Sequence, residues 1–148
     1  MAIGAFFAGS AAAAYDVNDV PLGASEAQIK QHFPAANCRA LEWPSRAADW
    51  RCDDSRIRFA GVDASVTFYL KRDAVEGFDV RFDRRAFDAV KQFLLTRYGK
   101  SASEREKPTT VEWQTNGERA RLNAEATRRR ASLLVWRGAF EDEIYKIR

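Results

Sequence analysis

The sequence is poor in the residues on which most enzyme active sites depend. Its 148 residues include one histidine and two cysteines, too few for a zinc site with four such ligands. It contains neither the G-x-x-x-x-G-K-[ST] phosphate loop nor the G-x-G-x-x-G dinucleotide turn, and the G-x-S-x-G turn of serine hydrolases is also missing. We therefore expect no cofactor, no metal site and no enzymatic activity.

A hydrolase centred on the one histidine, His32, is the weaker alternative. His32 falls in a helix expected over residues 25–33, beside Ile29 and Phe33. A histidine that acts as a general base needs a nucleophile or an acid held close to it. No motif near His32 supplies such a group, so a surface or half-buried histidine is the preferred interpretation.

Long apolar runs are also missing, and no stretch reaches the roughly 20 residues that a membrane-spanning helix needs. Residues 2–14 are uncharged, apolar or small, and Ala12 and Ala14 fit an A-x-A cleavage site before Tyr15. We predict a signal peptide, or a remnant of one without its basic start, over residues 1–14. The alternative is an alanine-rich tail. Residues 15–148 are expected to form a single domain.

The two cysteines favour export as well. Cys38 and Cys52 would close a loop of 15 residues. In an oxidising compartment such a bridge stabilises a protein by about 3 kcal/mol, whereas in the cytosol the two residues would remain thiols. A structural disulfide is the preferred interpretation, and it predicts a periplasmic or secreted protein.

The clearest structural element is an amphipathic helix from Asp83 to Gly99. Asp83 can accept hydrogen bonds from the first turn, apolar residues recur at helical spacing, and Gly99 suits the end of the helix. Alternation of apolar and polar residues predicts strands on both sides of this helix, at residues 38–43, 48–53, 57–59, 62–71, 75–82, 111–114, 118–126 and 131–136.

The order of these elements is helix, strands, helix, strands. We therefore predict an α+β fold, in which two helix-plus-antiparallel-meander halves pack as one domain. The halves span about residues 22–82 and 83–137. Each half alone would bury too small a core to be stable, so the two are expected to share one.

Two short motifs resemble those of known envelope proteins. The stretch Leu22–Ile29 resembles the G-x-(S/T)-x-x-x-(V/I) helix start of the SmpA/OmlA group, the BamE-like small envelope proteins. Arg97–Lys100, followed by Trp113, is similar to a helix end and first strand in small uncharacterised periplasmic proteins of proteobacteria. The resemblance implies a helical pair on a short antiparallel meander, of which the β-lactamase-inhibitor-protein fold is a doubled version. It implies no catalytic residues, and the lipobox cysteine of a membrane anchor is missing here.

Positive charge is concentrated in the second half of the chain. Residues 1–83 carry 9 Lys and Arg against 12 Asp and Glu, whereas residues 84–148 carry 15 against 9. Five arginines are expected to form one patch, because strand alternation brings two of them onto one face near an arginine-rich turn: Arg119, Arg121, Arg128, Arg129 and Arg130. Arginine makes paired contacts with phosphate and carboxylate groups. The alternative is a solvated surface of mixed charge.

The preferred functional hypothesis is an exported, non-enzymatic binding module of the bacterial envelope, whose ligand the sequence does not identify. Its partner would be another envelope protein or an anionic envelope component, bound on the sheet face opposite the helices. The expected aromatic anchors on that face are Trp43, Trp50, Tyr69 and Trp113. The alternative is attachment of the arginine patch to an anionic polymer or lipid. Nucleic acid is not expected, because the protein is predicted to be exported and lacks interleaved stacking aromatics.

Overall fold

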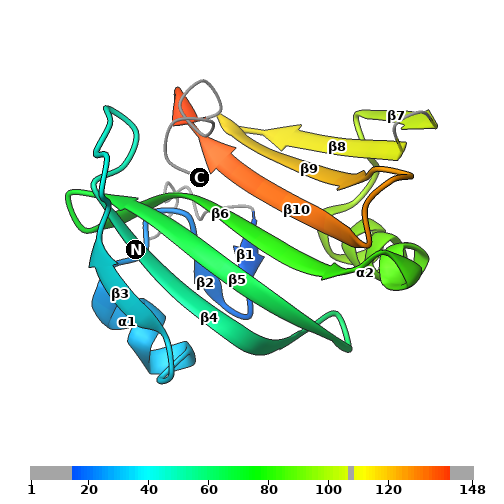
Figure 1. Cartoon of the computed structure of the whole chain (residues 1–148). Coiled ribbons are helices and arrows are strands. Elements are labelled where there is room, and N and C mark those ends of the chain that lie inside the picture. Colours follow the sequence, from blue (N-terminus) through cyan, green and yellow to red (C-terminus); the bar gives the residue numbers. More distant parts are fainter. Residues whose placement is uncertain (1–14, 107–108, 141–148) are drawn as a thin grey trace, which may run out of the picture.

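The computed structural model describes residues 15–106 and 109–140, about half of which belong to one antiparallel sheet of eight strands (Figure 1). The predicted signal peptide at residues 1–14 lies outside the described residues. The strand order across the sheet is β3-β4-β5-β6-β10-β9-β8-β7. Neighbours in this order are also neighbours in sequence except where β6 meets β10.

The strands of the large sheet are β3 (Asn37–Ala40), β4 (Trp50–Phe59), β5 (Val62–Lys71), β6 (Ala74–Asp83), β7 (Ser103–Glu106), β8 (Thr109–Thr115), β9 (Glu118–Ala124) and β10 (Arg130–Arg137). A separate small hairpin consists of β1 (Asp16–Val17) and β2 (Val20–Pro21). The helical segments are α1 (Glu26–His32) and α2 (Phe87–Tyr98), the latter preceded by a 3-10 turn, η1 (Arg84–Ala86).

Both helices begin as their sequences indicate. At α1 the Ser25 hydroxyl accepts a hydrogen bond from the Gln28 N–H (3.2 Å), and the Gln28 side chain accepts one from the Ser25 N–H (2.9 Å). At η1 the Asp83 carboxylate accepts a hydrogen bond from the Arg85 N–H (2.8 Å). Gly99 follows α2 with a φ of 89°, which glycine adopts without steric cost. A helical segment at the predicted place is therefore confirmed, although its first turn, Arg84–Ala86, is a 3-10 turn and the α-helix itself begins at Phe87.

The predicted α+β fold of two helix-plus-meander halves is wrong. β6 pairs with β10 from Gly77–Trp136 through to Asp83–Arg130, so the strands on either side of α2 form one continuous sheet. The described residues are mostly β, and they contain only two α-helices. Alternation shows which face of a strand is buried but not which strand lies beside it, so two meanders and one joined sheet fit the same pattern.

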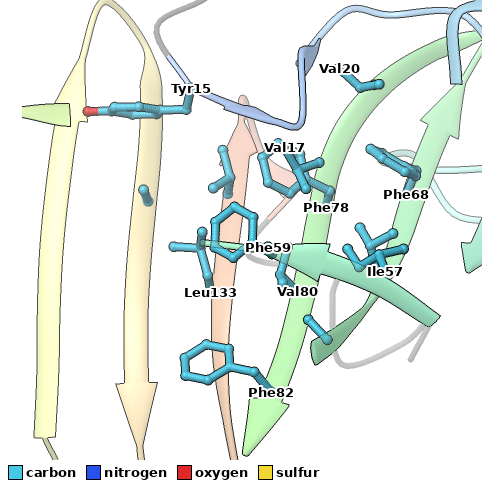
Figure 2. Packing of buried hydrophobic residues seen from close by; sticks show 14 of the residues in the cluster. Tyr15, Val17, Val20, Ile57, Phe59, Phe68, Phe78, Val80, Phe82 and Leu133 are labelled. Carbon is cyan, nitrogen blue, oxygen red and sulfur yellow. The ribbon is translucent and has the colours of Figure 1, made fainter. Parts of the chain in front are cut away.

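One face of the sheet, called here the covered face, packs against both helices and the small hairpin. Figure 2 shows Val17 and Val20 of the hairpin above Phe68, Phe78 and Val80 of the sheet. Ile29 of α1 and Val90 and Leu94 of α2 are fully buried in the same cluster. This layer is the main hydrophobic core.

The opposite face, called here the open face, carries mostly polar side chains and one smaller apolar cluster. That cluster contains Leu41, Ala48, Tyr69, Trp136 and Phe140. The Phe140 ring lies over Gly77 of β6, where a Cβ atom would come within 2.6 Å of it. Glycine at this position therefore makes room for the residue that covers this part of the sheet.

The predicted disulfide is present. Cys38 of β3 lies directly opposite Cys52 of β4, and a disulfide joins them. The bridge fastens the short edge strand β3 to the sheet. In the part of the chain that the structure describes, no helix has the length and apolar character needed to cross a bilayer.

Candidate anion-binding site

Seven arginines line two hollows at one end of the sheet, called here the arginine end. It is the end where β4 turns into β5, where β6 runs into η1, and where β10 begins (Figure 1). The pairing of Asp83 with Arg130, and of Ala64 with both Ile57 and Phe82, brings these segments side by side. All seven residues are exposed: Arg56, Arg58, Arg81, Arg85, Arg128, Arg129 and Arg130.

Two adjoining hollows lie at the arginine end, and Arg129 and Arg130 line both. The first, called the open-face hollow, has a volume of about 680 Å³ and is also lined by Arg81, Asn123, Glu125, Arg128, Ala131 and Ser132. The second, called the corner hollow, has a volume of about 1010 Å³. Its other lining residues are Ser55, Arg56, Ile57, Arg58, Val62, Asp63, Ala64, Phe82, Asp83, Arg85 and Ala86.

Four of the seven arginines form ion pairs with nearby carboxylates. These pairs are Arg58–Asp63 (2.8 Å), Arg81–Asp79 (3.0 Å), Arg85–Asp83 (3.0 Å) and Arg128–Glu125 (3.0 Å). Arg130 instead donates a hydrogen bond to the Ser65 hydroxyl (3.4 Å). Three of these pairs are exposed and therefore weak, so Arg58, Arg85 and Arg128 remain able to turn toward a bound anion. Asp79 is only 2% exposed, so Arg81 stays as a partner of this buried carboxylate.

The guanidinium groups of Arg56 and Arg129 are different. Among residues 15–106 and 109–140, neither group forms an ion pair or a hydrogen bond. Both line the corner hollow, Arg56 from the free edge of β4 and Arg129 from the segment before β10. Their positive charges are therefore available to a ligand.

Asp83 is an acidic residue inside this basic site. The Arg85 side chain, which donates from Nε (3.1 Å) and Nη2 (3.0 Å), and then the Arg85 backbone N–H lower the pKa of Asp83 to about 2. Asp83 is therefore ionised at all physiological pH values and neutralises Arg85. The net positive charge that a ligand meets comes from Arg56, Arg129 and Arg130, which form no ion pair with a described carboxylate.

The structure separates the five predicted arginines into two groups. Arg128, Arg129 and Arg130 lie together at the hollows. Arg119 and Arg121 share the open face of β9, but their guanidinium groups lie 5.3 and 5.0 Å from the centre of the Trp136 ring. Arg121 also pairs with Glu112 at 2.9 Å. These two residues lie against the Trp136 ring and do not line either hollow.

Four arginines of the site were missed by the sequence analysis, namely Arg56, Arg58, Arg81 and Arg85. Three of them belong to the half of the chain whose net charge is negative. Strand alternation puts Arg81 on a polar face, but only the β6–β10 pairing shows that this face adjoins Arg130.

The expected aromatic anchors are mostly not available to a ligand. Trp113 is buried in the core, where its indole N–H donates to the Gly99 carbonyl (2.8 Å), and Tyr69 is buried in the cluster with Phe140. Trp50 is half-buried. Of the four, only Trp43 is largely exposed, at 72%.

His32 is exposed at the end of α1. Its ring Nδ1 lies 3.2 Å from the Gln28 carbonyl oxygen. No hydrogen bond joins His32 to a serine or a carboxylate in the described part of the chain. This geometry gives no support to a hydrolase that uses His32.

One group of side chains has the spacing of metal ligands. Glu26, Cys38 and Cys52 have ligand atoms within 4.8 Å of one another. However, the two sulfur atoms are joined in the disulfide, and a thiolate is the form of cysteine that binds metal. In the oxidised protein these residues therefore form a structural bridge.

No family model matches the chain, and no curated protein or solved structure shows a significant similarity to it. The resemblance to BamE-like proteins stays a prediction that these comparisons do not test.

Proposed function

We propose that the protein is an exported, non-enzymatic binding module that holds an anionic component of the bacterial envelope at the arginine end. The observation that carries this proposal is the gathering of seven arginines around two adjoining hollows. The guanidinium groups of Arg56 and Arg129 have no acidic partner among the described residues. A cluster of this kind attracts phosphate or carboxylate groups.

The chemistry of arginine supports this choice of ligand. A planar guanidinium group can donate two parallel hydrogen bonds to one phosphate or carboxylate group. Each hydrogen bond to a charged group contributes about 1.5–3 kcal/mol. Arg129 and Arg130 are consecutive and line both hollows, so a ligand with several anionic groups could contact both hollows at once.

Two features support export. The first is the disulfide between Cys38 and Cys52, which is compatible with an extracellular location. The second concerns Tyr15, the residue after the predicted cleavage site. Tyr15 is buried, and its backbone N–H donates to the Glu118 carboxylate (3.2 Å). Cleavage before Tyr15 would create an ammonium group at this nitrogen, where Glu118 could form an ion pair with it.

The proposal is tested by titrating inorganic polyphosphate into the oxidised protein, residues 15–148, at low salt. Replacing Arg129 and Arg130 by glutamate is expected to weaken binding by more than about 100-fold, because two charge-assisted contacts, together about 3–6 kcal/mol, are lost. The same charge change at Arg46 and Arg72, exposed at the opposite end of the sheet, serves as the matched control and should have little effect. Binding by the unchanged protein should also weaken strongly at high salt, because salt screens exposed charges.

Two results would contradict the proposal. One is a lack of binding by the unchanged protein at low salt. The other is an equal loss in the two double variants, which would show attraction to net charge rather than to a site.

A further inference from the structure

We infer that the corner hollow binds the acyl chain of an anionic lipid, while arginines on its rim hold the lipid headgroup. This inference rests on the proposed function, because it needs the arginine end to bind an anionic group. It adds the class of the ligand, which is a single-chain anionic amphiphile rather than a water-soluble polymer.

Five of the thirteen residues that line the corner hollow are apolar, and three of them form its floor. Ile57, Ala64 and Phe82 form one row across β4, β5 and β6, since Ala64 pairs with both of the others. Val62 and Ala86 are half-buried and also line the hollow. Ile57, Ala64 and Phe82 are only 8%, 8% and 1% exposed, so the apolar surface that a ligand can cover here belongs mainly to Val62 and Ala86. An acyl chain lying across these two residues would remove that surface and its own from water, which a bare phosphate or sugar could not do.

The hollow is accessible from the edge of the sheet. β3 pairs with β4 only over Trp50–Asp53, so the rest of β4 has no neighbouring strand on that side within the described residues. The register of β4 against β5 shifts between Asp54 and Ile57, which marks an irregularity at this edge. A flexible chain can therefore enter beside β4 without parting any strand pair.

The rim of the hollow fits an anionic headgroup. Arg56 and Arg129 contribute charges that no carboxylate of the described chain neutralises. Arg58, paired with Asp63, and Arg85, paired with Asp83, add further hydrogen-bond donors at the rim but no net charge. A neutral headgroup would leave Arg56 and Arg129 without a partner, whereas a phosphate would pair with them. The combination of apolar floor and basic rim therefore selects an amphiphile with a negative head.

The inference is tested with alkyl phosphates of increasing chain length, used below the concentrations at which they form micelles. Each added methylene is expected to tighten binding about fourfold while it enters the hollow. Decyl phosphate should therefore bind far more tightly than butyl phosphate. Decyl maltoside has the same chain and a neutral headgroup, and it should bind much more weakly than decyl phosphate.

Substitutions at the floor of the corner hollow show where the alkyl chain of the ligand binds. Ala64→Leu should fill the floor and remove most of the advantage of decyl phosphate, while the affinity for butyl phosphate stays the same. Ala86→Leu, at another position that lines the hollow, should have the same effect. It replaces Ala64→Leu in this test if that variant does not fold. Ala27→Leu, exposed on α1, is the control and should change neither affinity.

The outcomes separate this inference from the proposed function. Equal binding of butyl and decyl phosphate would overturn the acyl site and leave the arginine end as a binder of soluble anions. Equal binding of decyl phosphate and decyl maltoside would overturn the anionic headgroup. If affinity rises with alkyl-chain length to the same extent in both floor variants as in the unchanged protein, the alkyl chain binds elsewhere. That result would overturn the assignment to this hollow. If neither polyphosphate nor any alkyl phosphate binds, the proposed function fails as well.

Discussion

Replacing Phe140 by alanine is expected to lower the free energy of unfolding by about 3–5 kcal/mol, as is typical for a fully buried phenylalanine. Phe140 is 1% exposed, and its ring centre lies 5.4 Å from that of Tyr69. Its loss would leave Tyr69 and Trp136 partly uncovered on the open face. Chemical denaturation of the oxidised protein measures the effect. Phe93→Ala, at a position on α2 that is 37% exposed, should cost clearly less and serves as the control.

A second substitution tests the fit between Phe140 and Gly77. In Gly77→Ala the new methyl group would lie 2.6 Å from a Phe140 ring carbon, which is too close for two carbon atoms. Overpacking of this kind costs about 1–3 kcal/mol. In the double variant that also carries Phe140→Ala, the clash is gone. The free energy of unfolding of this double variant should therefore fall by less than the sum of the losses in the two single variants. A neutral Gly77→Ala, or strictly additive losses, would contradict the packing of Phe140 on β6.

Removing the disulfide is expected to lower the free energy of unfolding by about 3 kcal/mol, the value for a loop of this length. Alanine at both Cys38 and Cys52 is the suitable change, because Cys52 is fully buried and a serine hydroxyl there would add a separate cost. The bridge also fastens β3, whose four residues pair only with β4. The reduced unchanged protein should be as unstable as the double variant. Equal stability of the oxidised protein and the double variant would contradict this role.

The local features of the fold could be predicted from the sequence. The capping residues Ser25 and Asp83, the helix between Asp83 and Gly99 and the strand alternation all depend on residues close together in the chain. The Cys38–Cys52 bridge could also be predicted, because the chain contains only two cysteines. In each case the physical rule acts over one or two turns of a helix or one short loop.

The joined sheet could not be predicted in this way. β6 and β10 both alternate apolar and polar residues, and each could have ended its own meander or paired with the other. For the same reason most of the arginine end could not be predicted. Arg56 and Arg129 line the same hollow only because of the order of the strands in the sheet. The position of Phe140 could not be predicted either. Its ring lies over Gly77 only because of the path that the chain takes after β10.

The central claim is that an anionic ligand binds at the arginine end, and mapping a bound anion residue by residue tests it most directly. Backbone amide NMR spectra of the isotope-labelled oxidised protein would be recorded at low salt as inorganic polyphosphate is added. The largest shift changes are expected at Arg56, Arg81, Asn123 and residues 128–132, with little change at Arg46 and Arg72. Changes concentrated at the opposite end of the sheet, or spread evenly over all exposed arginines, would contradict the claim.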